Sequence, residues 1–356
     1  MTMATLNRIR VLVVDDSALM RQMISALLSA DPAIDVVGTA PDPYVAREKI
    51  KALNPDVLTL DVEMPRMDGI AFLERLMSLH PMPVVMVSTL TQSGADVTLR
   101  ALELGAVDVF CKPGAGESRT LADLGPQLVE MVKSAARARV RALGERKRPQ
   151  TRVADVYRTN NRLVAIGAST GGVEALRDII TVLPADSPPV VVTQHMPPKF
   201  TASFAQRLNG MAAVSVCEAE DNQPIVFGHV YIAPGDRHLT VRRSGASYVT
   251  CLHDGPLVSG HRPSVDVLFT SVAEVCGGAA VGALLTGMGR DGAQGLLAMR
   301  KAGAATIGED ESSCVVYGMP RAAKDLGAVQ FELPLPLIPS EILRLCSEPG
   351  RKGVPS

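Results

Sequence analysis

Residues 163–172 read LVAIGASTGG: a short apolar run ends in a serine set among glycines, and a helical pattern follows directly. A strand, a tight turn and a helix in this order form the βα unit from which α/β domains are built. A serine at such a turn can be a nucleophile, part of a phosphate-binding loop or a plain turn residue. The rest of the chain has to decide among these three roles.

The same alternation of short apolar runs and helix-period stretches continues on both sides of this unit. In the second half we predict strands at 163–167, 189–194, 229–234, 280–287 and 304–308. In the first half we predict strands at 9–14, 34–40, 56–61, 83–88 and 106–112, with helices at 18–29 and 69–79. Strands that alternate with helices indicate parallel sheets with helices on both faces. We therefore expect two doubly wound, mainly parallel α/β domains.

The bulk composition is that of a soluble globular protein. A chain of 356 residues with 47% hydrophobic and 21% charged residues is long enough for two domains. The net charge of −1 gives no sign of a nucleic-acid partner. We expect a cytoplasmic protein, because no apolar run is long enough to span a membrane and the N-terminus lacks a signal-peptide core. The six scattered cysteines predict reduced thiols rather than disulfides or a zinc site.

A basic segment separates the two halves. Residues 137–152 hold seven basic residues and one acidic residue, which favours a solvated helix end that runs into a linker. A nucleic-acid-binding arm is disfavoured, because the segment has no aromatic residue to stack on a base. We expect a first domain at 1–120, a helix and basic linker at 121–159, a second domain at 160–347 and a disordered tail at 348–356.

Polar residues follow the predicted strands of the first half at one edge of its sheet. Asp15 and Asp16 follow the first strand, Asp61 ends the third, Ser88 ends the fourth and Lys112 ends the fifth. The carboxyl ends of parallel strands share an edge, so these side chains converge. Three carboxylates suit Mg²⁺, and a carboxylate beside the ion could accept a phosphoryl group.

This constellation resembles the response-regulator receiver domain, a five-fold βα fold of the flavodoxin type, in the motifs VVDDS, LDVEMPRMDG, VS and KP. The resemblance implies that Asp61 is the phospho-acceptor and that Lys112 and Ser88 are its switch partners. It also implies that Asp16 and Asp61 bind Mg²⁺, with Asp15 assisting through water. Receivers often carry an aromatic residue three positions before the lysine, where this chain has Val109.

In the second half, the serine of the opening stretch has candidate partners. Ser169 lies in a G-x-S-x-G pattern, and a serine hydroxyl needs a base that is itself oriented by a third group. His195 directly follows the apolar strand PVVVTQ, and Asp291 follows the strand AVGALLTG, so both emerge at the same sheet edge as Ser169. The order Ser–His–Asp differs from that of typical α/β-hydrolases. The amides of Met288 and Gly289, or one near Thr170, are candidate oxyanion donors.

A second interpretation uses some of the same residues. GMGRDG at 287–292 satisfies the dinucleotide fingerprint, and Glu309 follows about twenty residues later, where an acid would bind a ribose. This interpretation leaves Ser169 and His195 without a role. It also places Asp291 at the phosphate turn, where its charge would repel a pyrophosphate. We therefore regard the fingerprint as accidental.

Residues 160–345 closely resemble the catalytic domain of the chemotaxis protein-glutamate methylesterases, the CheB family. The motifs that carry the resemblance are IGASTGG, TQHMPPKFTASFAQRL, YIAPGDRHL, HRPSVDVLF, LTGMGRDGAQG and SCVVYGMPRAA. The resemblance implies that Ser169 is the nucleophile, His195 the general base and then acid, and Asp291 the orienting carboxylate. It also gives Met288 a part in the oxyanion hole and Thr170, with His261 and Arg262, supporting contacts.

The family further implies a phosphorylation-activated esterase that hydrolyses glutamate methyl esters and deamidates glutamines on chemoreceptors. A histidine kinase would be the phosphodonor, and Mg²⁺ at the receiver the only cofactor, with none at the esterase site. The protein would be peripheral to receptor arrays, and its unphosphorylated receiver would cover the esterase mouth. Two alternatives stay open on the residues alone: a response regulator whose second half is a binding module, and a dinucleotide-dependent enzyme.

Overall fold

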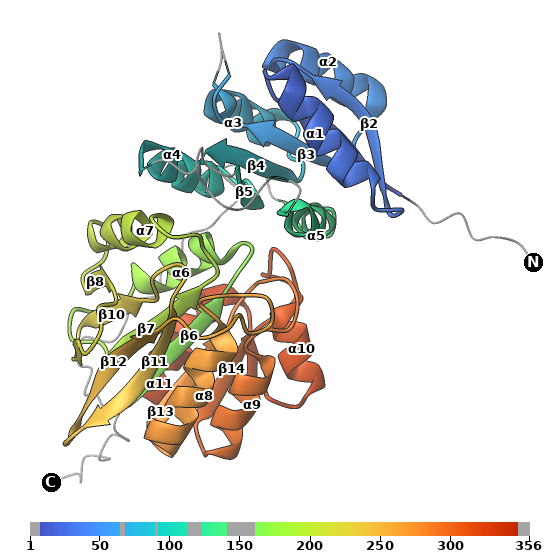
Figure 1. Ribbon diagram of the computed structural model, residues 1–356. Helices are drawn as coiled ribbons and strands as arrows, with labels where there is room; N and C mark the ends of the chain where they lie inside the picture. The colour runs from blue at the N-terminus through green and yellow to red at the C-terminus, as the bar shows by residue number, and fades with distance from the viewer. Residues whose placement is uncertain are drawn as a thin grey trace, which may run out of the picture. The chain divides into compact units, whose positions relative to one another are not determined.

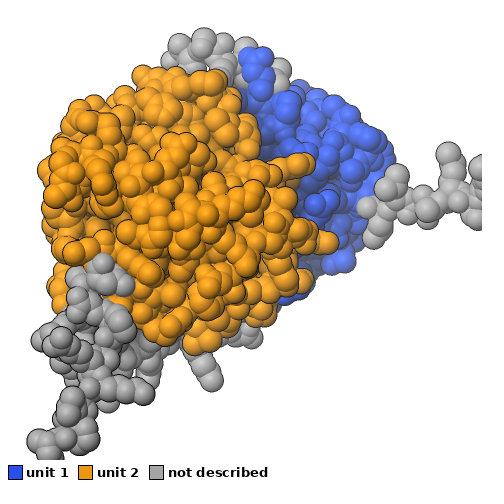
Figure 2. Space-filling model, turned by 90° about the horizontal axis from the view of Figure 1, so that it is seen from below, with its two compact units in different colours: residues 1–147 blue, residues 148–356 orange. Residues whose placement is uncertain are grey.

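The computed structural model of the chain describes residues 8–64, 68–89, 92–112, 121, 123–140 and 161–347. The chain divides into two compact units, residues 1–147 and 148–356, which Figure 2 shows in different colours. Most of the predicted basic linker and all of the predicted disordered tail lie outside the described residues.

The first unit holds one parallel sheet of five strands, as predicted (Figure 1). Its strands, in the spatial order β2-β1-β3-β4-β5, are β1 (Ile9–Val14), β2 (Ile34–Ala40), β3 (Val57–Asp61), β4 (Val84–Thr89) and β5 (Asp108–Lys112). Its helices are α1 (Ala18–Ser29), α2 (Pro43–Leu53), α3 (Gly69–Leu79), α4 (Gln92–Glu103) and α5 (Gly125–Ala135). The chain turns in opposite directions from β1 and from β3, so the switch point of the sheet lies between these two strands.

Local sequence explains the helix ends in this unit. Ser17, Asp42 and Asp68 precede α1, α2 and α3, and each side chain accepts a hydrogen bond from a backbone N–H of the first turn. Residues 11–14 of β1 and the apolar residues of β3 are buried on both faces of the sheet, as a sheet covered by helices requires. Helix α5 packs against β3, β4, β5 and α1 and therefore belongs to this unit.

The second unit contains a seven-stranded, all-parallel sheet. In spatial order its strands are β15 (Phe331–Leu333), β14 (Ala305–Glu309), β13 (Ala280–Leu284), β6 (Leu163–Ala168), β7 (Val190–Gln194), β10 (His229–Ile232) and β8 (Ser215–Glu218). Its α-helices are α6 (Gly172–Ile180), α7 (Phe200–Asn209), α8 (Val265–Cys276), α9 (Ala293–Lys301), α10 (Met319–Asp325) and α11 (Ile338–Leu345). The prediction of a doubly wound, mainly parallel α/β domain is confirmed.

The connections of this sheet diverge from its centre. From β6 the chain passes through α6 to β7, and from β13 it passes through α9 to β14 on the opposite side. Right-handed crossovers place such helices on opposite faces of the sheet, and Figure 1 shows α8 and α9 together in front of the strands. The switch point therefore lies between the adjacent strands β6 and β13. Ligand sites of open α/β sheets form at this position.

A small antiparallel sheet was not predicted. It consists of β9 (Pro224–Ile225), β11 (His238–Ser244) and β12 (Ser247–His253), and a two-residue turn joins β11 to β12. One face of β11 packs on α8 through Leu239 and Val241, while Arg242 and Arg243 are exposed. These strands alternate in polarity, whereas our strand predictions were based on continuous apolar runs.

Within the described residues, no helix has both the length and the apolar character needed to cross a membrane.

Candidate active site

Ser169 lies at the turn between β6 and α6. Its backbone N–H donates to the carbonyl of Thr286 at 3.0 Å, beyond the neighbouring strand β13. The turn passes through Gly171 at φ 79°, where a Cβ would lie 2.6 Å from Val315. Glycine is required there both for the backbone conformation and for the space. The serine is thus held in a tight strand-to-helix turn at the switch point.

His195 follows β7 and lies beside Ser169. Its backbone N–H donates to the carbonyl of Ala168 at 3.1 Å, and its Nδ1 is 3.1 Å from Ser169 Oγ. The amide nitrogen of Gln194 donates to the carbonyls of both Ser169 and His195, at 3.0 and 3.1 Å. One buried side chain thus links the two segments. Sequence reasoning did not identify Gln194, because nothing in its spacing distinguishes it from a core strand residue.

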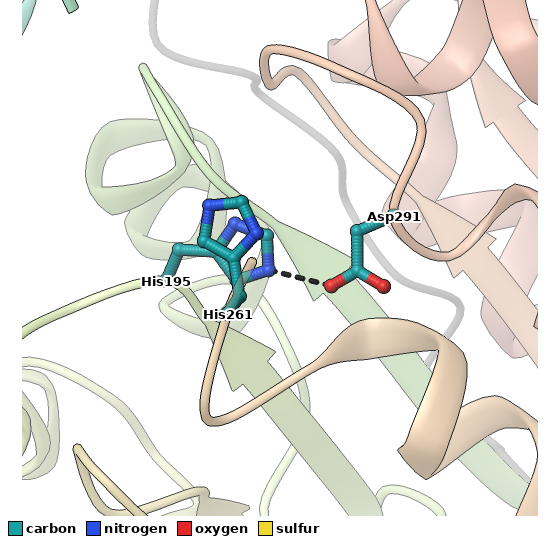
Figure 3. Close-up of side chains that lie close together, drawn as sticks. All are labelled: His195, His261 and Asp291. Atoms are coloured by element: carbon teal, nitrogen blue, oxygen red, sulfur yellow. Dashed lines mark hydrogen bonds and ion pairs between the residues drawn. The ribbon is translucent and has the colours of Figure 1, made fainter. Parts of the chain in front are cut away.

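Asp291 completes a chain of hydrogen bonds. Its Oδ2 is 2.7 Å from His195 Nε2, as Figure 3 shows. The carboxylate also accepts hydrogen bonds from the Ser264 hydroxyl and from the N–H groups of Val265 and Asp266 at the start of α8. Burial acts to raise the pKa of the Asp291 carboxyl. The hydrogen bond from His195, the charge of His195 and the backbone N–H donors outweigh burial and lower this pKa to about 2.

These contacts determine the tautomer of His195. A carboxylate can only accept, so His195 Nε2 carries the proton that is donated to Asp291. Nδ1 then has a free lone pair, which accepts the hydroxyl proton of Ser169. The arrangement provides a nucleophile, a base within hydrogen-bond reach and a buried anion that orients the base.

His261 stacks on His195, with ring centroids 3.7 Å apart and ring planes inclined at 6° (Figure 3). Its Nδ1–H donates to the carbonyl of Ser259 at 2.8 Å. Burial, with the nearby His195, lowers the pKa of His261 to about 4, so this ring is neutral at pH 7. Arg262 holds the following segment by donating to Asp236. The sequence motif HRPSVDVLF contains both His261 and Arg262. The stacking of His261 on His195 depends on tertiary folding, so the motif alone does not predict it.

His195, His261 and Asp291 also lie close enough together to suggest a metal site. An imidazole binds a metal through a lone pair that lies in the plane of its ring. Two stacked rings whose planes are 6° apart do not direct their lone pairs at one common point. This geometry therefore favours a stacked hydrogen-bonding site over a metal centre.

The predicted oxyanion segment lies beside the serine. Among the described residues, the backbone N–H groups of Met288 and Gly289 donate to no carbonyl, whereas that of Gly287 donates to Val316. Thr170 is buried, and its carbonyl accepts the hydroxyl of Thr286 at 3.0 Å. Within the part of the chain that the structure describes, these two amides, which directly follow Gly287, thus have no carbonyl acceptor, as an oxyanion site requires.

Gly287 is packed against the serine. A Cβ at this position would lie 2.7 Å from Ser169 Cβ and 2.3 Å from Met319 Sδ. We expect Gly287→Ala to lower the free energy of unfolding by about 1–3 kcal/mol and to displace Ser169, with a loss of activity. Denaturant unfolding and an esterase assay check both effects. Gly210→Ala, whose Cβ has ordinary contacts, is the control, and equal behaviour of the two variants contradicts the expectation.

The dinucleotide interpretation is not supported by the position of its acid. Glu309 is 1% exposed, and its two carboxylate oxygens accept from Thr286 N–H and from the Ser313 hydroxyl. Asp291, inside the same glycine motif, is hydrogen-bonded to His195. Neither carboxylate is available to a ribose.

A second cluster lies at the switch point of the first unit. The carboxylates of Asp15, Asp16 and Asp61 have oxygens within 4.8 Å of one another. Lys112 Nζ lies 3.0 Å from both Asp15 and Asp61, which are buried. Burial raises the pKa of Asp61 to about 6, with Lys112 acting to lower it and Asp15 to raise it. Three neighbouring carboxylates carry like charges and offer oxygen ligands, and such a group fits a divalent cation such as Mg²⁺.

Ser88 is buried and lies in β4 at the same edge as Asp61 and Lys112. Its Oγ accepts a hydrogen bond from the hydroxyl of Thr98 on α4 at 3.3 Å. Val109, at the position where the resemblance leads one to expect an aromatic residue, is half-buried and packs on the core of this unit, and the neighbouring Phe110 is fully buried.

The fold and the two sites define a two-unit α/β protein with a serine hydrolase arrangement at one switch point and an acidic receiver-type cluster at the other. The CheB methylesterase family model matches residues 164–342, and the response regulator receiver domain model matches residues 11–122. The chain belongs to the CheB methylesterase family.

Relatives cover almost the whole chain. The protein-glutamate methylesterase/protein-glutamine glutaminase of Salmonella typhimurium is 55% identical over 95% of this chain and 97% of its own length. The protein of the same name from Escherichia coli K12 is 54% identical over the same shares. The crystal structure of the Thermotoga maritima CheB methylesterase catalytic domain superposes with a TM-score of 0.51, at 39% identity, covering 52% of this chain and 98% of that chain.

Proposed function

We propose that this chain is a protein-glutamate methylesterase and protein-glutamine glutaminase of chemoreceptors whose activity is controlled by phosphorylation of its receiver domain. The observation that carries the esterase is the hydrogen-bonded series of Ser169, His195 and Asp291 at the switch point of the larger sheet. Family membership supplies the substrate class.

The proposed reaction begins with Ser169 Oγ attacking the carbonyl carbon of a glutamate methyl ester. His195 Nδ1 takes the serine proton, and Asp291 stabilises the resulting imidazolium through Nε2–H. The amides of Met288 and Gly289 receive the negative charge that develops on the carbonyl oxygen. The tetrahedral intermediate then expels methoxide, which leaves as methanol with the proton from His195.

Water completes the cycle. It gives a proton to His195 and attacks the acyl-enzyme, and Ser169 leaves with that proton restored. The receptor side chain is released as glutamate. Deamidation of glutamine follows the same steps, with ammonia in place of methanol as the leaving group.

In the receiver we propose that Asp61 accepts a phosphoryl group from a histidine kinase. Mg²⁺, when bound by Asp15, Asp16 and Asp61, would neutralise charge on the transferred phosphoryl oxygens. Lys112 is placed to form an ion pair with a phosphoryl oxygen, since it already contacts Asp61. The hydroxyl of Ser88, which accepts a hydrogen bond from Thr98, would donate its own proton to another phosphoryl oxygen.

The domain assignment follows from these roles. We propose a receiver at 1–120 that is completed by helix α5, because this helix packs on the receiver sheet, then a basic linker up to 159, a catalytic domain at 160–347 and a tail at 348–356. The protein would work in the cytoplasm beside receptor arrays, without inserting into the membrane.

The test is methanol release from receptor membranes that carry labelled methyl esters, with and without Mg²⁺ and a small phosphodonor. We expect the phosphodonor to raise the rate by on the order of tenfold, a coupling of ordinary size for two linked sites. Asp61→Asn removes the acceptor and should keep only the unstimulated rate. Asp56→Asn, at the exposed residue immediately before the same strand, is the matched control.

The two parts of the proposal fail separately. Release that ignores the phosphodonor would leave the esterase standing and refute its control by Asp61. A folded wild-type protein that releases no methanol from any methylated receptor would refute the esterase itself.

A further inference from the structure

Glu309 is a buried acid that the proposed reaction does not use. It ends β14 and is 1% exposed. Its Oε2 accepts the backbone N–H of Thr286 at 2.8 Å, and its Oε1 accepts the hydroxyl of Ser313 at 2.9 Å. The side chain thus reaches from β14 to the segment that follows β13.

Thr286 connects this acid to the nucleophile. Its carbonyl accepts the N–H of Ser169 at 3.0 Å, and its hydroxyl donates to the carbonyl of Thr170 at 3.0 Å. The same hydroxyl accepts the N–H of Val316 at 3.0 Å. Every polar group of Thr286 is therefore engaged, and Glu309 is the partner of its backbone N–H. The next residues along the chain are Gly287 and Met288 of the proposed oxyanion segment.

We infer that Glu309 is a positioning residue for the reaction at Ser169. In its uncharged form it holds the Thr286 segment in the geometry that this reaction needs. In its ionised form it slows the reaction. The inference rests on the proposed function, because it assigns Glu309 an effect on the same reaction.

The uncharged form can keep the hydrogen bonds with Thr286 and Ser313. The carbonyl oxygen of a protonated Glu309 accepts from Thr286, and its O–H donates to Ser313 Oγ. The Ser313 hydroxyl then donates to the carbonyl of Asp310, 3.3 Å away. Burial raises the pKa of Glu309 to about 7, so the uncharged form predominates below neutrality.

The ionised form works against the reaction. It places a negative charge in a buried site next to Thr286, to which Glu309 is hydrogen-bonded. Thr286 is followed along the chain by Gly287 and Met288. Developing negative charge on the substrate oxygen would be repelled by it, and burial weakens the screening.

Other titratable groups near Glu309 lie mainly on the turn after β14. Asp310 and Cys314 act on it directly, and the β13 end contributes the uncharged Thr286. Asp310 in turn interacts with Lys324 of α10, and Lys324 pairs with Glu332 of β15. Tyr317 donates to Glu332. None of these groups is altered in the test below.

The test compares wild type with Glu309→Gln, an amide of the same shape that cannot ionise. We would measure the rate at which a fluorophosphonate labels Ser169 in the full, phosphodonor-activated protein from about pH 6 to pH 9. The two rates should agree near pH 6, and Glu309→Gln should become about three- to tenfold faster than wild type by about pH 8.5. Glu220→Gln, at an exposed carboxylate, should follow wild type throughout.

Thermal melting of the same variants from about pH 4 to pH 9 gives an independent readout. The folded-state pKa of Glu309 lies above its ordinary value of 4.5, so wild type loses stability as the pH rises from there to about 7 and keeps that loss above it. The melting temperature of Glu309→Gln minus that of wild type should therefore increase over this window and stay constant above it.

Labelling rates of wild type and Glu309→Gln that keep a constant ratio across the pH range would overturn the inference, as would an unchanged difference in melting temperature. Both readouts are independent of the receptor substrate. Failure of the proposed function is seen instead in methanol release, so the two failures are distinguishable.

Discussion

Replacing Ser169 by alanine is expected to lower methanol release from methyl-esterified receptors by about 10³-fold or more, because it removes the hydroxyl that lies beside the base His195. The oxyanion amides and substrate binding remain, so a residual rate above that of water is expected. Initial rates measured with excess receptor membranes give the ratio directly. The melting temperature should change little, since the Ser169 hydroxyl has His195 as its partner at a half-buried position.

Ser244→Ala is the matched control for this variant, because Ser244 lies exposed on the β11–β12 hairpin. It should retain the wild-type rate. A folded Ser169→Ala variant that releases methanol within about tenfold of wild type would contradict the assignment of the nucleophile.

Replacing Asp291 by asparagine is expected to lower kcat by about 10⁴-fold. Asparagine keeps the size of the side chain but loses its charge, and its NH₂ group can donate to His195 Nε2. Nε2 would then give up its proton, and Nδ1 would carry it instead. A protonated Nδ1 cannot accept the hydroxyl proton of Ser169, so the base is lost although the residues stay in place.

Thermal melting of the variant separates this effect from unfolding. Asp291 has a folded-state pKa lowered to about 2, so its contribution to stability is present above its ordinary pKa of 3.8 and is lost only as the pH falls through about 2. At neutral pH the wild type therefore has this contribution and the variant lacks it, so thermal melting at the assay pH must show that Asp291→Asn is folded. Asp325→Asn, at a carboxylate whose side chain is 69% exposed, should behave as wild type. A kcat of Asp291→Asn within tenfold of wild type would remove Asp291 from the mechanism.

Much of the fold could be predicted from local patterns. Strand β2 and helices α1 and α3 have the bounds that the apolar runs and helix periods indicated. Both parallel sheets could be predicted because their strands appear in the sequence as continuous apolar runs, which is typical of strands buried on both faces. The sheet of β9, β11 and β12 was missed because its strands are half-exposed and alternate in polarity.

The part of the candidate site that lies at strand ends could be predicted from the sequence. Ser169, His195 and Asp291 each follow an apolar strand, and strand ends of a parallel sheet converge, so their proximity could be inferred. The supporting residues could not. Gln194 and Ser264 act through hydrogen bonds that depend on how a strand end and a helix start meet.

Glu309 is a case in which a sequence motif predicted a role that the structure excludes. Its spacing from GMGRDG matched a ribose-binding acid, and only its burial and its contacts with Thr286 and Ser313 exclude that role. A spacing motif carries no information on whether a side chain faces solvent or the interior.

Control of Ser169 by Asp61 is tested most directly by the rate at which a fluorophosphonate labels the full chain, with the modified peptide located by mass spectrometry. A phosphodonor with Mg²⁺ should speed labelling of Ser169 by about tenfold in wild type and leave the rate unchanged in Asp61→Asn. Labelling at another residue, or labelling of Ser169 at the same rate with and without phosphodonor, would contradict a phosphorylation-controlled serine esterase.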